Sequence, residues 1–219
     1  MKLEKMDDFF AARLGGYDEH MRREIEGDSG FYAYTASLLP AAVGSRVLDL
    51  GCGTGLELEE YFRLNPGAAV TGLDLSEAML NALKAKFPGK KLDLVRASYF
   101  DVPLGRGQYD AAVSVESLHH FPAEMKASLY EKLHRALAEN GVFVLTDYFA
   151  ESEEAEKEYF RDLAALKKEQ GLSDDVFYHY DTPLTVGHET DVLRRAGFRD
   201  VRIMKRWGES TYTVLACRD

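Results

Sequence analysis

Residues 47–55 read Val47-Leu48-Asp49-Leu50-Gly51-Cys52-Gly53-Thr54-Gly55, and this stretch decides the fold. An apolar run that stops at closely spaced glycines predicts a buried strand followed by a tight turn. A helical pattern from Leu56 to Leu64 follows at once. Glycine is needed where the backbone takes positive φ or where a ligand approaches the main chain. The unpaired N–H groups of the following helix would then face a ligand carboxylate.

Further along the chain, strand-like and helix-like segments alternate. The first strand pattern is Arg46–Leu50, and the others are Ala69–Leu73, Leu92–Val95, Tyr109–Val115, Val142–Thr146, Asp200–Lys205 and Thr211–Cys217. Helical patterns occupy Ser76–Phe87, with Ser76 as N-cap, and Ala123–Ala138, with Asn140-Gly141 as a left-handed stop. Such alternation predicts βαβ units with right-handed crossovers, and the short connection before Thr211 predicts a hairpin. The predicted fold is α/β, a Rossmann-like, doubly wound sheet of seven mostly parallel strands with a C-terminal antiparallel hairpin.

The length of 219 residues suits one domain, 1–219. We divide it into an N-terminal helical lid (1–40), a ligand-binding core (41–150), a cap insertion (151–185) and a C-terminal helix and hairpin (186–219). In the lid, Gly15-Gly16 breaks a first helix, and a second begins near Asp28-Ser29, N-capped there, and stops before Pro40. In the last part, a helix covers His188–Ala196.

Composition excludes several classes of function. The net charge is −10, from 27 Lys+Arg against 37 Asp+Glu, and this field repels nucleic acid. The basic residues between Arg194 and Arg206 alternate with apolar ones, as on a solvated face. No apolar run is long enough to span a membrane, the N-terminus lacks a signal-peptide core, and Cys52 and Cys217 show no metal-ligand spacing. We expect a cytoplasmic protein with reduced thiols, a small-molecule partner, and no nucleic-acid or membrane partner.

A glycine loop after a strand is a weak signal alone, because nicotinamide enzymes use G-x-G-x-x-G where this chain has G-x-G-x-G. The nine residues resemble the first motif of class I S-adenosylmethionine (SAM)-dependent methyltransferases, which commonly reads V-L-D-x-G-C-G-T-G. Residues 71–80 resemble the second motif of that family. The resemblance implies SAM as cofactor, with the ribose hydroxyls on Asp74, the adenine near Leu75 and Met79, and the ammonium facing Asp49. The loop contacts would come from Gly51, Cys52, Gly53 and Gly55.

Three further segments are similar to the same family. In Ala97–Leu104, Ser98 stands where relatives often have an aspartate on the adenine amino group, and Tyr99 would flank the ring. Ser114–Phe121 resembles S-x-x-L-H-H-F/L, in which the strand end, including Ser114, passes under the methionine part. Residues 9–18 resemble the lid of small-molecule members, including ubiquinone and menaquinone biosynthesis methyltransferases. Tyr17 would there close over SAM, or it only packs the first helix.

Methyl transfer is an in-line displacement, so the protein mainly aligns the reactants and removes water. A base is needed only when the acceptor carries a proton to be lost. Glu116, at a strand end, and His119 are the candidate catalytic residues, and Tyr148, Tyr178 and His179 are the candidate substrate contacts. Neighbouring side chains on a turn point apart, so we expect His119 and His120 not to share a metal, and we assign no metal ligands. The cap aromatics could instead pack a core or a dimer interface, which leaves a monomer or a homodimer open.

Two other functions remain open. Residues 189–198 resemble the E-x-x-x-L-x-x-A-G-F segment of carboxy-SAM synthases, which share the fold and the long cap but catalyse a different reaction on SAM. A non-catalytic nucleotide-binding or nicotinamide-dependent protein would use a similar loop. The sequence favours SAM-dependent methylation of a small molecule, and leaves open whether the acceptor atom is carbon, nitrogen, oxygen or sulfur.

Overall fold

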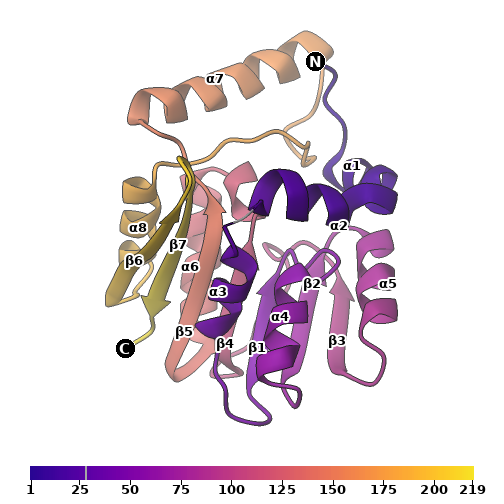
Figure 1. Ribbon diagram of the computed structural model, residues 1–219. Coiled ribbons are helices and arrows are strands. Elements are labelled where there is room, and N and C mark those ends of the chain that lie inside the picture. Colours follow the sequence, from indigo (N-terminus) through magenta and orange to yellow (C-terminus); the bar gives the residue numbers. More distant parts are fainter. Residues whose placement is uncertain (28) are drawn as a thin grey trace.

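A single sheet runs through the middle of the molecule in the computed structural model, which describes residues 1–27 and 29–219 (Figure 1). Its strands are Arg46–Leu50 (β1), Ala69–Asp74 (β2), Lys91–Arg96 (β3), Tyr109–Val115 (β4), Leu137–Tyr148 (β5), Asp200–Trp207 (β6) and Thr211–Cys217 (β7). The strand order is β3-β2-β1-β4-β5-β7-β6. Strands β1 to β5 pair in parallel, and β7 runs antiparallel between β5 and β6. The predicted Rossmann-like sheet with its C-terminal hairpin is confirmed.

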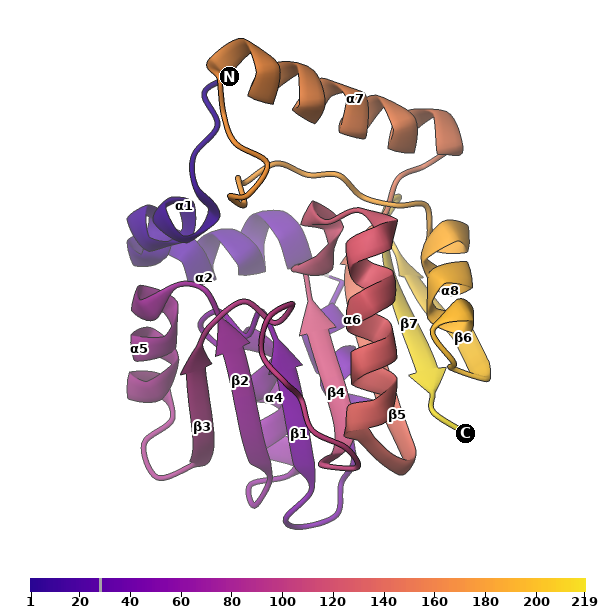
Figure 2. The same cartoon turned by 180° about the vertical axis from the view of Figure 1, so that it is seen from behind.

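Helices cover both faces of this sheet (Figures 1 and 2). They are Met6–Arg13 (α1), Tyr17–His20 (α2), Phe31–Ser37 (α3), Leu56–Leu64 (α4), Glu77–Lys86 (α5), Ala123–Ala136 (α6), Glu153–Gln170 (α7) and Val186–Arg195 (α8). Residues of α3, α4 and α5 join one hydrophobic core, and residues of α6 and α8 join a second. Successive side chains of β1 point to opposite faces of the sheet, so Leu48 and Leu50 enter one core and Val47 enters the other.

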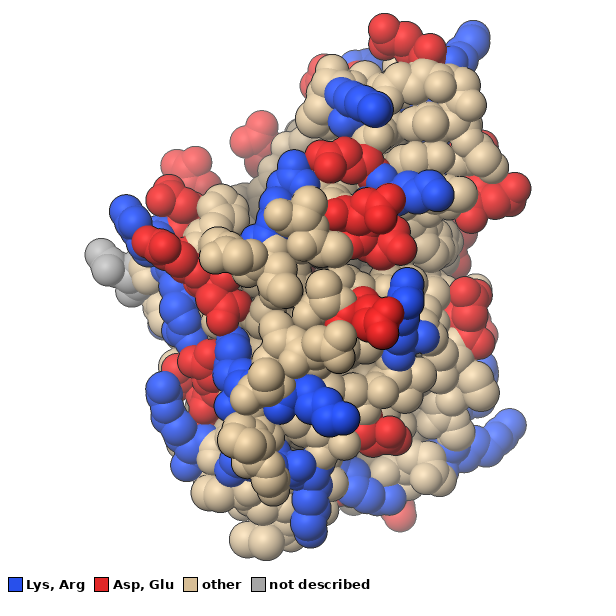
Figure 3. Space-filling model, turned by 90° about the vertical axis from the view of Figure 1, so that its right-hand side faces the viewer, with Lys and Arg blue, Asp and Glu red and all other residues tan. Residues whose placement is uncertain are grey.

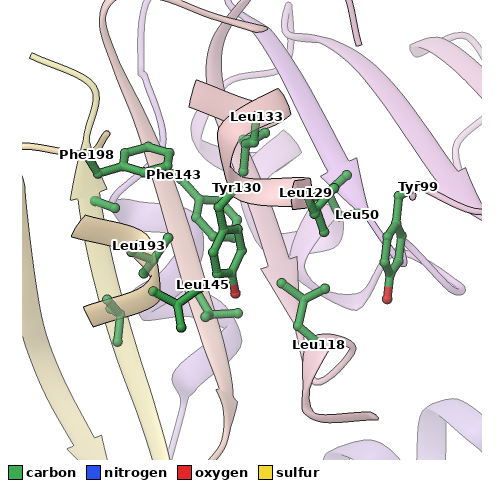
Figure 4. Packing of buried hydrophobic residues seen from close by; sticks show 14 of the residues in the cluster. Leu50, Tyr99, Leu118, Leu129, Tyr130, Leu133, Phe143, Leu145, Leu193 and Phe198 are labelled. Carbon is green, nitrogen blue, oxygen red and sulfur yellow. The ribbon is translucent and has the colours of Figure 1, made fainter. Parts of the chain in front are cut away.

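The second core is packed by large side chains from α6 and α8. Tyr130 and Leu133 of α6 point toward the sheet and lie close to Phe143 and Leu145 of β5 (Figure 4). All four side chains are fully buried. This packing holds α6 against the parallel part of the sheet and so positions the segment that connects β4 to α6.

Several predicted element boundaries are wrong, including the end of α6 and the start of the lid helix. Helix α6 ends at Ala136 and not at Ala138, because Leu137 is already extended and pairs with Tyr109 of β4. Asn140 does take the left-handed conformation, with φ of 60°, but it lies within β5 beyond the end of the helix. In the lid, the helix predicted to begin near Asp28-Ser29 begins at Phe31 and has Gly30, not Ser29, as its N-cap, while Asp28 lies outside the described residues. The N-cap at Ser76 is confirmed, since its hydroxyl accepts the Met79 N–H at 3.4 Å.

The lid and the cap lie at the carboxyl ends of the parallel strands. Helices α1 and α2 cross above β1 and β2, and α7 forms an outer layer above them (Figures 1 and 2). Two main-chain hydrogen bonds join lid and cap, from the Met6 N–H to the Phe177 carbonyl and from the His179 N–H to the Glu4 carbonyl, each 3.0 Å long. Ligands of open α/β sheets bind at this edge, so the fold places the site beneath the lid.

The described surface carries charges of both signs. Lys and Arg side chains are interspersed with Asp and Glu over the side that Figure 3 shows. Among the described residues, no helix combines the length and the apolar character that crossing a membrane requires.

Candidate functional site

The turn after β1 carries three glycines in the left-handed region, with φ of 74° at Gly51, 46° at Gly53 and 74° at Gly55. Only one of them opens onto free space. A Cβ on Gly55 would lie 3.0 Å from Phe87, and one on Gly51 would lie 2.0 Å from the Ser117 hydroxyl. A Cβ on Gly53 would meet nothing nearer than the Tyr17 hydroxyl, at 3.8 Å. The main chain at Gly53 is therefore the part of the turn that a ligand can approach.

A small cavity, here called the loop cavity, lies between this turn and the lid. It holds about 50 Å³ and receives Met6, Phe10 and Tyr17 from the lid. Seven residues predicted from the sequence to bind the cofactor line it, together with Glu116: Tyr17, Gly51, Gly53, Asp74, Leu75, Met79 and Tyr99.

Asp74 ends β2 and supports the turn. Its carboxylate accepts the Gly53 N–H at 2.9 Å and the Ser76 N–H at 2.8 Å. Burial raises the pKa of this carboxyl, and the backbone hydrogen bonds from Ser76 and Gly53 oppose that effect. Each carboxylate oxygen has a second lone pair, so Asp74 can also accept hydrogen bonds from two ligand hydroxyls.

Two buried carboxyl groups lie beneath the turn. Both oxygens of Asp49 and Oε1 of Glu57 have no hydrogen-bond partner among the described residues. Burial raises the pKa of Asp49 well above its usual range, and the neighbouring Glu57 raises it further. Burial also raises the pKa of Glu57. Two adjacent buried carboxyls do not both ionise unless a cation compensates their charge, so this pair would be stabilised by a ligand that carries an ammonium group.

Five of the predicted cofactor residues do not line the loop cavity: Asp49, described above, and four others. Cys52 is buried with its sulfur against Gly72, and Gly55 packs on Leu83 and Phe87. Ser114 donates to the Leu50 carbonyl at 2.9 Å, and Ser98 accepts the Phe100 N–H at 3.2 Å. These side chains shape the turn and its neighbouring strands from within.

A larger cavity of about 940 Å³, here called the lid cavity, adjoins the first. Of the predicted residues, His119, Tyr148 and His179 line it, whereas Tyr178 does not. The main chain of Tyr178 forms an isolated antiparallel β-bridge with that of Lys5. The Lys167 ammonium lies 5.7 Å from the centre of the Tyr178 ring. Four residues line both cavities: Phe10, Tyr17, Glu116 and His120.

Glu116 lies at the boundary between the two cavities, directly after β4. Its φ is 49°, a conformation that a non-glycine residue seldom adopts and that is found preferentially at functional sites. Its N–H donates to the Thr146 carbonyl at 2.9 Å, and its Oε1 is buried with no partner among the described residues. Burial raises the pKa of Glu116 to about 8. The fold thus holds a buried carboxyl oxygen without a hydrogen-bond partner where the two cavities meet.

A cluster of imidazoles and carboxylates lies beside Glu116. His119 Nδ1 lies 2.5 Å from Asp147, and His119 Nε2 lies 3.5 Å from Asp181. His120 Nδ1 lies 3.3 Å from the same Asp181 oxygen. The expectation that the two histidines point apart is wrong, because their ring centres are 4.0 Å apart and both rings reach Asp181. They share a short 3₁₀ turn, Leu118–His120, and the cap brings Asp181 to both.

The charges in this cluster shift its proton affinities in opposite directions. Burial alone would lower the pKa of His119, but Asp147 and Asp181 outweigh it and raise that pKa to about 10. Burial lowers the pKa of His120, and it lowers that of His179 to about 4. The two imidazoles, in turn, hold the pKa of Asp181 far below its usual range despite its partial burial.

The sequence analysis missed four residues of the site: Glu57, Ser117, Asp147 and Asp181. Asp147 had a usable signal, since it lies near the carboxyl end of a central strand, where ligands of α/β sheets bind. Asp181 had none, because its place depends on how the cap folds over the strands.

Known proteins that resemble this chain in sequence or fold include methyltransferases. Residues 47–141 match a family model described as a methyltransferase domain. An uncharacterised methyltransferase of Synechocystis sp. is 30% identical over 56% of this chain and 56% of its own length. The carboxy-S-adenosyl-L-methionine synthase of Campylobacter concisus is 28% identical over 79% of this chain and 76% of its own length. The S-adenosylmethionine-dependent methyltransferase structure from Mesorhizobium loti superposes with a TM-score of 0.62 and 22% identity, covering 88% of this chain and 99% of that one.

Proposed function

Residues 47–141 form a class I, SAM-dependent methyltransferase domain, and from this premise we propose that the chain methylates a small molecule held in the lid cavity. One observation carries the proposal. The loop cavity, built on the glycine turn and Asp74, adjoins a cavity of about 940 Å³, and Glu116 lines both. A donor in the first cavity and an acceptor in the second would meet at that boundary.

The residues of the loop cavity fit SAM. Asp74 would accept the ribose hydroxyls, and Met79 and Tyr99 would enclose the adenine. The carboxyls of Asp49 and Glu57, which are buried beneath the turn and do not line the cavity, would take the ammonium. The bound cofactor supplies a methyl group on a sulfonium, which needs no further activation. The work of the protein is then to align donor and acceptor and to exclude water, and a lid that closes over the strand ends suits both.

The lid cavity determines which acceptors fit. Its aromatic residues include Phe9, Phe10 and Tyr148, and its polar residues include Glu116 and His119. Aromatic faces attract flat, partly apolar molecules and cationic amines. Glu116, at the boundary, would hold an N–H or O–H of the acceptor so that its lone pair faces the methyl group. His119, which lies next to Glu116, would be the second contact to the acceptor. Asp147 would hold the His119 ring in place.

A second candidate function has a specific observation in its favour. The match to the Campylobacter carboxy-SAM synthase extends over 79% of this chain, and thus beyond the domain at residues 47–141. The match to the Synechocystis methyltransferase spans only 56% of that protein's length. Mass spectrometry of the ligand that co-purifies with the protein separates the two functions, because carboxy-SAM is heavier than SAM by a carboxyl group.

The proposal is tested by incubating the purified chain with methyl-labelled SAM and a panel of metabolites. We expect label in one class of small molecule, reduced transfer with the Asp74→Ala variant at a SAM concentration that saturates the unchanged chain, and binding of SAM but not of a nicotinamide dinucleotide in calorimetry. Binding of SAM without transfer to any member of a broad panel would favour the second candidate. Binding of the dinucleotide alone would overturn both.

A further inference from the structure

The cluster beside Glu116 has a property that methyl transfer alone does not require. We propose that His119, His120 and Asp181 form a binding site for one divalent transition-metal ion in the wall of the lid cavity. The three ligand atoms come from a turn after β4 and from the cap, and they all lie within 4.8 Å of one another. The inference concerns metal binding, so it stands or falls separately from the proposed methyl transfer.

The distances within the triad match a coordination site better than they match direct hydrogen bonds. Asp181 Oδ1 lies 3.5 Å from His119 Nε2 and 3.3 Å from His120 Nδ1. Charge-assisted hydrogen bonds are shorter, about 2.7–2.9 Å. Metal–ligand bonds of about 2.0–2.1 Å in a tetrahedron place neighbouring ligand atoms about 3.3–3.4 Å apart. The two distances that involve Asp181 therefore already suit an ion at the centre of the triad, and the third lies within 4.8 Å.

Asp147 supplies the second layer that such a site needs. A ligating histidine almost always gives its other ring N–H to a carboxylate or a carbonyl, which fixes the ring. Asp147 lies 2.5 Å from Nδ1 of His119, so Nε2 is the nitrogen left for the ion. The Asp147 carboxylate also accepts the Leu118 N–H at 2.9 Å, which anchors it in turn.

The neighbouring triad of Glu116, His119 and Asp147 is a poorer site. It would have to use Nδ1 of His119, which Asp147 already holds, and Glu116 lies 3.9 Å from that nitrogen. In the triad with Asp181, His120 Nδ1 also meets the Tyr180 carbonyl, at 3.1 Å, but a neutral carbonyl competes with an ion less strongly than the Asp147 carboxylate does, and the ion would replace the proton there. We therefore assign the ion to the triad that contains Asp181.

The proposed site is enclosed yet reachable. Both rings are buried, while the Asp181 side chain is 47% exposed and lines the lid cavity with them. Three protein ligands leave a coordination position free, which would face the cavity. Two imidazoles and one carboxylate suit Zn²⁺, Co²⁺ or Fe²⁺ and suit Mg²⁺ or Ca²⁺ poorly, because the last two prefer all-oxygen ligands.

The test uses the full chain, stripped with a chelator and titrated with Co²⁺ and Zn²⁺. We expect one equivalent to bind, with visible Co²⁺ absorption that Zn²⁺ displaces. Asp181→Ala and His120→Ala should each weaken binding by about 100-fold or more, and Asp147→Asn by about 10- to 100-fold, as for other second-layer carboxylates.

The matched control is His188→Ala. His188 Nδ1 pairs with Glu156 at 2.7 Å, so the control also removes an imidazole from a carboxylate, but outside the cluster. Circular dichroism shows whether each variant is folded, and Asp181→Ala, at a half-exposed residue, keeps the test decisive if His120→Ala does not fold. The inference is overturned if no stoichiometric ion binds, or if Asp181→Ala binds Co²⁺ as tightly as the His188→Ala control does.

Discussion

Gly51 and Ser117 pack so closely that no side chain fits between them. A Cβ at Gly51 would lie 2.0 Å from the Ser117 hydroxyl oxygen and 2.7 Å from the Ser117 Cβ. Gly51 belongs to the turn after β1, and Ser117 follows β4, so the contact joins the two central strands at their carboxyl ends. The contact therefore fixes the relative position of the glycine turn and of Glu116, which precedes Ser117.

We predict that Gly51→Ala lowers the free energy of unfolding by about 2–5 kcal/mol, from the overpacking and from a left-handed φ of 74°. Replacing Ser117 by glycine in the same chain removes the clash, so the double variant should recover all but about 1–2 kcal/mol. Gly53→Ala is the control, because its Cβ would meet nothing within 3.7 Å. Urea unfolding measures all three variants. A double variant no more stable than Gly51→Ala would show that the clash with Ser117 is not the cause.

We predict that Asp74→Ala weakens SAM binding by about 10- to 100-fold, because charge-assisted hydrogen bonds to two hydroxyls are lost. Part of the loss comes through the turn, since Asp74 also accepts the Gly53 N–H. Asp93→Ala, an exposed carboxylate on the neighbouring strand β3, is the control. Calorimetric titration gives both affinities, and equal values for the two variants would mean that Asp74 does not hold the ribose.

Binding of SAM should release a proton. Burial raises the pKa of both Asp49 and Glu57 in the free protein, so the pair retains a proton that a bound ammonium would displace. The affinity for SAM should therefore rise with pH until the pH exceeds the raised pKa of the Asp49–Glu57 pair. This rise should be weaker in the Glu57→Gln variant. Calorimetry in two buffers with different ionisation enthalpies counts the protons. Proton uptake on binding, or none, would contradict the placement of the ammonium at Asp49.

We predict that Lys126→Met lowers the free energy of unfolding by about 3–5 kcal/mol, because it leaves a buried carboxylate unpaired. Lys126 and Glu189 join α6 to α8 with an N–O distance of 2.6 Å, and the Tyr130 hydroxyl donates to the same carboxylate. The side chains are 2% and 0% exposed. In Lys126→Met/Glu189→Met no charge is left buried, so most of the stability should return. Urea denaturation tests this, and additive losses in the double variant would rule out the pairing as the cause.

Local sequence patterns determined the architecture of this protein. Runs such as Arg46–Leu50 and Tyr109–Val115 are buried on both faces, so hydrophobicity alone marks them as central strands. The glycines at 51, 53 and 55 marked the turn because a left-handed backbone is a requirement of the position itself. The order of these elements then implied the sheet and the edge at which the site lies.

Only the tertiary structure decided which polar groups meet at that edge. His119, Asp147 and Asp181 come from a turn, a strand and the cap, and no spacing along the chain links them. The tertiary structure also decided which motif residues face the site. Cys52 and Ser114 stand at motif positions that suggested a ligand contact, but both side chains are buried in the protein interior. The physical reason is common to both cases. A strand or turn forms from neighbouring residues, whereas a site depends on how distant segments pack, and packing energy is distributed over many contacts that no short pattern records.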